Sequence, residues 1–191
     1  MADNYTVVDA TEQTTLSAED IGSSVKMPRV RATGYLPAVY VTVTRPNDTN
    51  AYAANDAIAD SASAATLASA ALGRTATGTG LIVGLTLQCS DPAAVHRVEV
   101  DLYNASITAI NDNAEATRLT ANKLKYIGTI TLAALAKKTT NSDQAEASDF
   151  TIRIPYQCAG SSLIYFVPRI LDADTPIAST AYTFGFHTAQ N

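Results

Sequence analysis

The sequence predicts an all-β protein, an antiparallel two-sheet sandwich of jelly-roll type with an extended N-terminal arm. Two stretches show the period of two that marks a strand, because successive side chains leave opposite faces. In the first, one face collects the apolar side chains of Leu81, Val83, Leu85 and Leu87. In the second, one face collects those of Val98, Val100 and Leu102.

The second stretch also indicates how its sheet meets solvent. The opposite face of residues 97–103 carries Arg97, Glu99, Asp101 and Tyr103. One apolar face and one charged face are typical of an antiparallel sheet that packs on one side only. We therefore expect this second face to be solvated.

Further strands are expected wherever alternation or an apolar run lies between turn residues. These strands are predicted at residues 36–44, 126–132, 150–154, 163–171 and 181–187. Phe150, Ile152 and Ile154 are expected to point inward, and the last strand places Tyr182, Phe184 and Phe186 on one face. Seven or eight short strands joined by polar turns favour a sandwich, jelly roll or related Greek key.

Four connecting stretches carry weaker signals. Alanine at residues 64–72 favours a helix, but the nearby Gly, Ser and Thr equally favour a loop with a brief strand. Residues 116–125 are expected to hold one or two helical turns, and residues 133–148 a loop. Residues 110–114 predict a tight turn stabilised by Asn and Asp side chains.

The chain divides by composition at about residue 35. Residues 1–35 lack a sustained period, and we interpret them as an arm that docks on neighbouring subunits, with a polar tail as the alternative. Residues 36–191 are expected to form the β-sandwich domain. Within the arm, Pro28 favours an edge or extended segment because it lacks an amide donor.

Charge and hydropathy exclude several classes of protein. The formal net charge of −5 opposes general nucleic-acid binding, which needs Lys and Arg against phosphates. The N-terminus shows no signal-peptide pattern, and no apolar run approaches the about 20 residues that span a bilayer. Cys89 and Cys158 each follow an expected strand, and without an export signal we expect reduced thiols.

Residues capable of catalysis or metal binding do not fall into established motifs. His96 and His187 lack a partner at ligand spacing, and the serines lie outside a nucleophile elbow. Glu99 and Asp101 share one strand face and could mimic a glycosidase pair, but a solvated charged face is the preferred interpretation. The turn at 111–113 and the pair Asp172 and Asp174 offer oxygen ligands, fewer than a Ca²⁺ loop needs.

Tyrosines are the remaining candidate for ligand binding. A sugar-binding platform could draw on Tyr40, Tyr52, Tyr103, Tyr126 and Tyr165. Half-buried tyrosines in strands more often belong to a core or an interface. The residues therefore predict no enzyme, no cofactor and no metal.

Four segments resemble accessory virion proteins of tailed bacteriophages. They are residues 20–31 (DIGSSVKMPRVR), 43–58 (VTRPNDTNAYAANDAI), 98–114 (VEVDLYNASITAINDNA) and 126–130 (YIGTI). The resemblance covers about residues 20–130 in pieces. This sequence departs from the pattern at Ser23 and Asn55, where the family has glycine.

The resemblance implies a non-enzymatic capsid decoration or cement protein that binds the major capsid protein and stabilises the shell. It implies a homo-oligomer, most often a trimer, on the capsid surface after synthesis in the host cytoplasm, without nucleic-acid or membrane partners. The arm residues expected to contact the capsid or other subunits are Val25, Met27, Pro28, Val30 and Arg31. The alternatives are a head fibre, a tail component or a host-glycan-binding β-sandwich.

Overall fold

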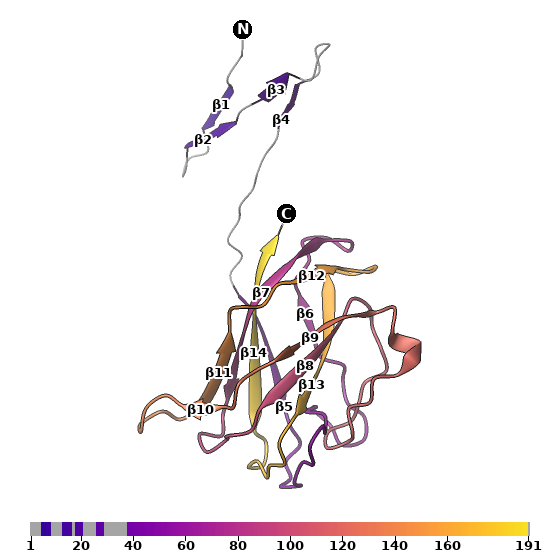
Figure 1. The fold of residues 1–191 in the computed structure, drawn as a ribbon, viewed down its shortest axis with the longest axis vertical. Coiled ribbons are helices and arrows are strands. Elements are labelled where there is room, and N and C mark those ends of the chain that lie inside the picture. Colours follow the sequence, from indigo (N-terminus) through magenta and orange to yellow (C-terminus); the bar gives the residue numbers. More distant parts are fainter. Residues whose placement is uncertain (1–4, 9–12, 17, 21–25, 29–37, 191) are drawn as a thin grey trace. The chain divides into compact units, whose positions relative to one another are not determined.

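The computed structural model describes residues 5–8, 13–16, 18–20, 26–28 and 38–190, drawn in Figure 1. The chain separates into two units, Met1–Thr33 and Gly34–Gln190. In the first unit, β1 (Tyr5–Val8) pairs with β2 (Gln13–Leu16), and β3 (Ala18–Asp20) pairs with β4 (Lys26–Pro28), both antiparallel.

The arm residues predicted to contact partners fall partly within these strands. Met27 and Pro28 lie in β4, for which the backbone alone is described. Val25, Val30 and Arg31 lie outside the described residues. Their interface role stays a prediction.

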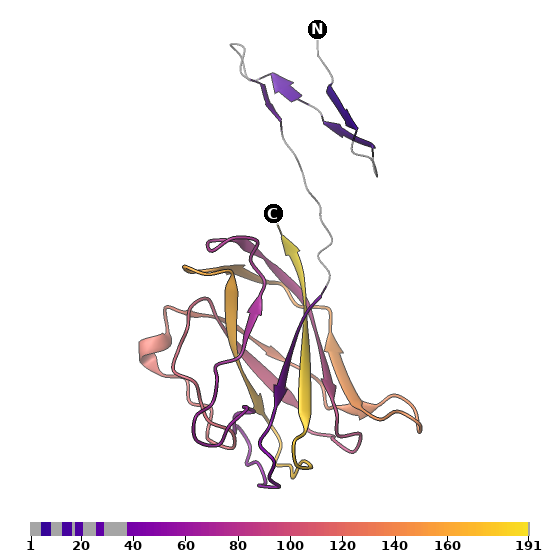
Figure 2. The ribbon, with the colours of Figure 1, turned by 180° about the vertical axis from the view of Figure 1, so that it is seen from behind.

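The second unit is a two-sheet antiparallel sandwich, seen from opposite sides in Figures 1 and 2. The larger sheet has the order β10 (Ala136–Lys137), β11 (Ala145–Asp149), β7 (Thr79–Cys89), β14 (Ala181–Gln190), β5 (Val39–Thr44), with β12 (Ile154–Gln157) also paired to β7. The smaller sheet has the order β6 (Ser69–Ala71), β13 (Leu163–Ile170), β8 (Val98–Tyr103), β9 (Tyr126–Thr131). The predicted all-β sandwich is confirmed, whereas its jelly-roll type stays a prediction.

The core lies between the two sheets and centres on phenylalanines. Phe166 of β13 meets Phe184 and Phe186 of β14 edge to face, with ring centroids 5.3 and 5.1 Å apart. This geometry places the positive edge of one ring against the negative face of another. The inward positions predicted for Tyr182, Phe184 and Phe186 are confirmed, since all three are fully buried.

The alternation predicted for residues 81–87 is wrong in its N-terminal half. Ile82 is fully buried, as are Leu85 and Leu87, whereas Leu81 and Val83 are partly exposed. The register of β14 against β7 shifts between His187 and Thr188. A bulge inserts one extra residue and reverses which face the following side chains occupy.

The solvated face predicted for residues 97–103 is confirmed at the exposed Arg97 but is wrong at Asp101 and Tyr103. Val98, Val100 and Leu102 are fully buried as expected, but Asp101 and Tyr103 on the other face are buried too. The segment between β8 and β9 lies over this face and brings Arg118 to Asp101. Sequence periodicity within one strand cannot show that a distant loop covers its polar side.

Three local expectations change in the structure. The helical turns predicted at residues 116–125 reduce to one 3₁₀ turn, η1 (Thr120–Asn122). Residues 64–72, in contrast, take one of their two expected forms, a loop ending in the brief strand β6. The expected loop at 133–148 contains the β10–β11 hairpin. Phe150 was expected inward but is 54% exposed, because the chain leaves the ladder between β11 and β12.

The contrast between two phenylalanines gives a test of the core. Replacing Phe166 by Ala should lower the free energy of unfolding by about 3–5 kcal/mol, because a cavity opens between the sheets. The same change at the exposed Phe150 should cost about 1 kcal/mol or less. Denaturant unfolding of both variants checks this, and similar losses would contradict the assigned core.

Candidate functional site

The segments 43–58 and 98–116 interlock at one end of the sandwich. The amide of Ala57 donates to the carbonyl of Ala114 at 2.8 Å, and that of Asn113 donates to Ala57 at 3.1 Å. The amide of Ala116 donates to the carbonyl of Asn55 at 2.9 Å. Two segments far apart in sequence therefore form one continuous structure.

A buried arginine, tyrosine and aspartate fasten this structure from within. The Arg45 side chain is fully buried, donates from Nε to the Tyr52 hydroxyl at 3.3 Å and from Nη1 to the Asp48 carbonyl at 2.8 Å. The Tyr52 hydroxyl donates to Asp112 Oδ1 at 2.5 Å, and the Ala59 amide donates to the same oxygen at 2.9 Å. Burial is the main cause that raises the pKa of Asp112, and Arg45 opposes it.

These hydrogen bonds bear on whether the turn at residues 111–113 could provide oxygen ligands for a metal ion. The turn exists, with Asn113 in the left-handed region at φ 58°. Its central carboxylate receives protein donors on Oδ1 and lies beside Arg45. The described residues contain no group of three His, Cys, Asp or Glu side chains that could hold a metal ion.

Asn55 occupies the position where the resembling proteins have glycine. Its φ is 74°, in the left-handed region. Asparagine is one of the few residues besides glycine that adopts this conformation routinely. The departure in sequence is therefore compatible with the turn before Asp56.

The outer face of β8 holds an ionic cluster of two carboxylates and two arginines. Arg118 donates to Asp101 from Nε at 2.7 Å and from Nη2 at 2.5 Å, and reaches Glu99 at 3.1 Å. Arg169 pairs with Glu99 and lies 3.6 Å from Asp101. The Thr129 hydroxyl adds a hydrogen bond to Asp101 at 2.6 Å. Each carboxylate therefore has more than one cationic or hydroxyl partner.

The cluster weighs against the glycosidase-like interpretation of Glu99 and Asp101. The two do share one strand face, as predicted, but Asp101 is buried, the Glu99 side chain is only 15% exposed, and arginines neutralise both. A retaining or inverting glycosidase needs one carboxyl that keeps its proton as a general acid. Here guanidinium and hydroxyl donors already occupy both oxygens of Asp101 and both oxygens of Glu99.

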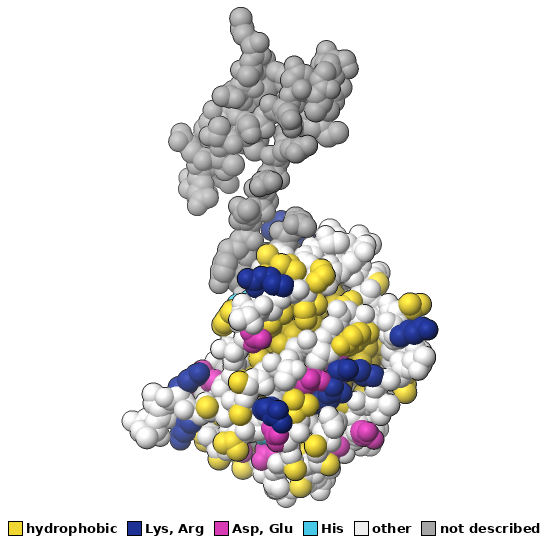
Figure 3. Space-filling model, in the orientation of Figure 1, with side chains coloured by type: hydrophobic (Ala, Val, Ile, Leu, Met, Phe, Trp, Pro, Cys, Tyr) yellow, Lys and Arg dark blue, Asp and Glu magenta, His cyan; other side chains and the backbone are white. Residues whose placement is uncertain are grey.

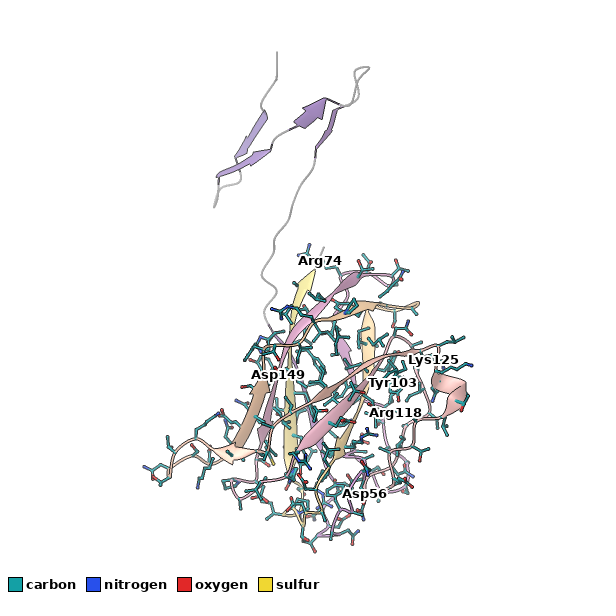
Figure 4. All side chains as sticks on the ribbon, in the orientation of Figure 1. Asp56, Arg74, Tyr103, Arg118, Lys125 and Asp149 are labelled. Carbon is teal, nitrogen blue, oxygen red and sulfur yellow. The ribbon has the colours of Figure 1, made fainter. Side chains whose placement is uncertain are left out.

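A cleft of about 330 Å³ adjoins this cluster. Its walls are formed by Tyr103, Arg118, Leu119, Thr120, Asn122, Lys123 and Tyr126. Figure 4 shows Tyr103, Arg118 and Lys125 gathered on the side of the body that carries η1. Hydrophobic and basic side chains lie next to each other on this face in Figure 3.

Arg118 joins the cleft to the ionic cluster. Its side chain is 45% exposed, and its guanidinium carbon lies 5.3 Å from the centroid of the Tyr126 ring. Hydrogen bonding to Asp101 is the main cause that raises the pKa of Arg118. The guanidinium is thus charged, fixed by Asp101 and still accessible from the cleft.

The structure separates the five tyrosines of the predicted sugar platform. Tyr103 and Tyr126 meet with centroids 5.8 Å apart, and Tyr165 lies opposite Tyr103 in the β13–β8 ladder. Tyr40 is exposed on β5 of the other sheet, and Tyr52 is buried beside Arg45. Two of the five, Tyr103 and Tyr126, line the cleft.

The two histidines occupy separate sites, His96 buried and His187 partly exposed. His96 is buried, with Nδ1 2.6 Å from a carboxylate oxygen of Asp174 and Nε2 3.3 Å from the Tyr182 hydroxyl. Cys89 and Cys158 are both free and buried, and burial raises the pKa of the Cys89 thiol to about 11. His187 packs against the ring of Phe150, with centroids 4.9 Å apart.

Tyr103 and Tyr126 are two of the five tyrosines that the sequence offers as a sugar platform, whereas no sequence pattern indicates the cationic side of the cleft. Arg118 and Lys123 lie in a polar stretch between two strands, where no period indicates their direction. Arg169 lies in an apolar strand with no pattern linking it to Glu99. The one available signal was the pair of carboxylates, Glu99 and Asp101, on a single face of β8, which would need cationic partners from elsewhere in the chain if that face were covered.

Removal of one carboxylate should reveal how much the ionic cluster contributes. Asp101→Asn should lower the free energy of unfolding by about 3 kcal/mol, because the buried end of the ion pairs with Arg118 and Arg169 loses its charge. Asp172→Asn, which breaks the exposed pair with Arg97, is the matched control and should change stability far less. Equal losses in denaturant unfolding would contradict the structural role of the cluster.

Acid should destabilise the protein through His96. Burial lowers the pKa of His96 despite the nearby Asp174, Asp91 and Asp172, so the unfolded chain binds the proton more readily. The stability from neutral His96 is complete above its ordinary pKa of 6.5 and is lost as pH falls below that value. One such group contributes at most about 1.4 kcal/mol per pH unit.

The variant His96→Gln provides the comparison. Between pH 7 and 5 its free energy of unfolding should fall less steeply than that of the original protein. Denaturant titrations at several pH values measure both slopes. Identical slopes would show that His96 does not titrate between the two states.

Comparison of this chain with protein-family models, curated proteins and solved structures finds no match. Within the described ranges, no helix is long and apolar enough to cross a membrane.

Proposed function

We propose that this protein is a non-enzymatic structural protein of a bacteriophage virion. Its most specific form is a capsid decoration or cement protein that binds the major capsid protein and stabilises the shell. The protein would act as a homo-oligomer, with a trimer as the expected form, on the outer capsid surface. A head fibre or tail component is the alternative position in the same particle.

One observation carries the proposal. The segments 43–58 and 98–114, which resemble phage virion proteins, are the ones that interlock through Tyr52 and Asp112. The residues of these two segments therefore have a common structural role, which is to hold two loops and the strand β8 together. A motif whose side chains bind one another suits a scaffold, since catalytic groups must stay available to a substrate.

The N-terminal segment supports a docking role by its charge. Residues 1–20 carry five acidic residues and no Lys or Arg, namely Asp3, Asp9, Glu12, Glu19 and Asp20. Residues 21–37 carry Lys26, Arg29 and Arg31 and no acidic residue. Opposite charges on consecutive stretches suit attachment to complementary surfaces, and such attachment weakens as salt rises.

Deletion of residues 1–33 tests the arm. We expect the truncated protein to keep a folded body and to bind empty capsids about a hundredfold or more weakly, because the charged contacts of the arm are lost. The capsids are assembled from the major capsid protein encoded with this chain, and co-sedimentation measures binding. Substitution of Lys137 and Lys138 by Ala, on the β10–β11 hairpin, is the control.

The outcome separates the parts of the proposal. Full-strength binding by the truncated protein would rule out docking by the arm. No binding by either protein would contradict the capsid role itself. Density at one vertex of the particle, rather than over the whole shell, would favour a fibre or tail position.

A further inference from the structure

The cleft beside the ionic cluster continues into a second depression. That neighbouring cleft has a volume of about 220 Å³ and shares Leu119 and Asn122 with the first. Its remaining wall is mostly apolar, including Ile107 and Ile110, with Glu115 at its edge. A groove with two compartments on either side of Leu119 accommodates a ligand of more than one unit.

The larger compartment offers apolar surface in a form that suits a sugar ring. Tyr126 is 37% exposed and Leu119 is 53% exposed, although side chains of this size are usually covered. Tyr103 packs edge to face against Tyr126 and holds that ring in place. Aromatic rings provide a rigid surface with an apolar face, on which the C–H face of a pyranose can pack.

The polar groups of the compartment are cationic. Arg118 and Lys123 line it, and none of its lining residues is acidic. Among the described residues, Nη1 of Arg118 makes no hydrogen bond, whereas Nε and Nη2 are held by Asp101 and Glu99. Lys123 forms no ion pair within the same part of the chain. Two donors are therefore available for an anion, on a protein whose net charge is −5.

We propose that this cleft binds an acidic saccharide, a sugar unit that bears a carboxylate. The carboxylate accepts hydrogen bonds from the free N–H groups of Arg118 Nη1 and from the ammonium of Lys123. The ring packs on Tyr126 and Leu119, and Thr120 and Asn122 meet its hydroxyl groups. The next unit of the chain occupies the compartment lined by Ile107 and Ile110.

The composition of the walls favours this ligand over other anions. A free phosphate would leave the exposed Tyr126 and Leu119 without a partner. A nucleic acid needs a continuous basic track along its phosphates, and here Glu115 borders the second compartment. The proposal concerns the body alone and does not depend on the virion role.

The test uses the full chain and two pairs of oligosaccharides. Trigalacturonic acid is compared with maltotriose, and 3′-sialyllactose with lactose, by calorimetry and NMR titration at low salt. At least one acidic sugar should bind with a Kd below about 1 mM, and its neutral counterpart about tenfold more weakly. Raising the salt concentration should weaken the acidic sugar alone.

Substitutions assign the binding to the cleft. Lys123→Ala should weaken binding about tenfold, because a charge-assisted hydrogen bond is lost. Leu119→Asp should weaken it further, because it places a carboxylate between the two compartments. Lys138→Ala removes an exposed lysine outside the cleft and should leave binding unchanged. Equal melting temperatures of the variants exclude an effect through folding.

Three results would overturn the proposal. In the first, neither acidic sugar binds below about 10 mM. In the second, binding persists at full strength in both Lys123→Ala and Leu119→Asp. In the third, inorganic phosphate or a hexaglutamate peptide binds as tightly as the best sugar with the same sensitivity to both substitutions, which would assign the cleft to another anion.

Discussion

The burial of strand β8 on both faces is the constraint around which the second unit is organised. One face enters the core through Val98, Val100 and Leu102. The other face carries two carboxylates, and burying an unpaired carboxylate is prohibitively costly. Arg118 and Arg169 are recruited from the neighbouring loop and strand to neutralise them.

This neutralisation determines where the long connection between β8 and β9 lies. Arg118 anchors the connection to Asp101, and the hydroxyl of Thr129 in β9 bonds the same carboxylate. The residues that follow Arg118 then form the rim of the cleft. The ionic cluster and the cleft are therefore two sides of one arrangement, in which a structural arginine remains accessible.

The Arg45, Tyr52 and Asp112 cluster applies the same principle at the end of the sandwich. Its members come from two turns, and Tyr52 and Asp112 share one buried site although they lie 60 positions apart in the sequence. Buried polar groups of this kind specify a single arrangement when all partners are present, and destabilise the protein when one is missing. Loops fixed in this way resemble rigid elements and suit a subunit that must present a constant surface.

The sequence by itself determined the strands whose pattern is set by local geometry. The alternation in β8 and β14 identified the core face correctly, because side chains on a strand must alternate. The same rule failed at β7, where a bulge shifts the phase, and at Phe150, where the chain leaves the ladder. Neither event has a signature in the residues of one strand alone.

Tertiary structure decided everything that depends on distant partners. Glu99 and Asp101 carry the same charge whether solvated or buried, and only the approach of Arg118 and Arg169 distinguishes the two cases. Tyr103 and Tyr126 were two of five candidate tyrosines, and only the path of the connecting loop brings them together with Lys123 in one cleft. Periodicity indicates which side chains share a face of a strand. The energy of pairing between side chains on different elements depends on their distances in space, and the sequence does not contain those distances.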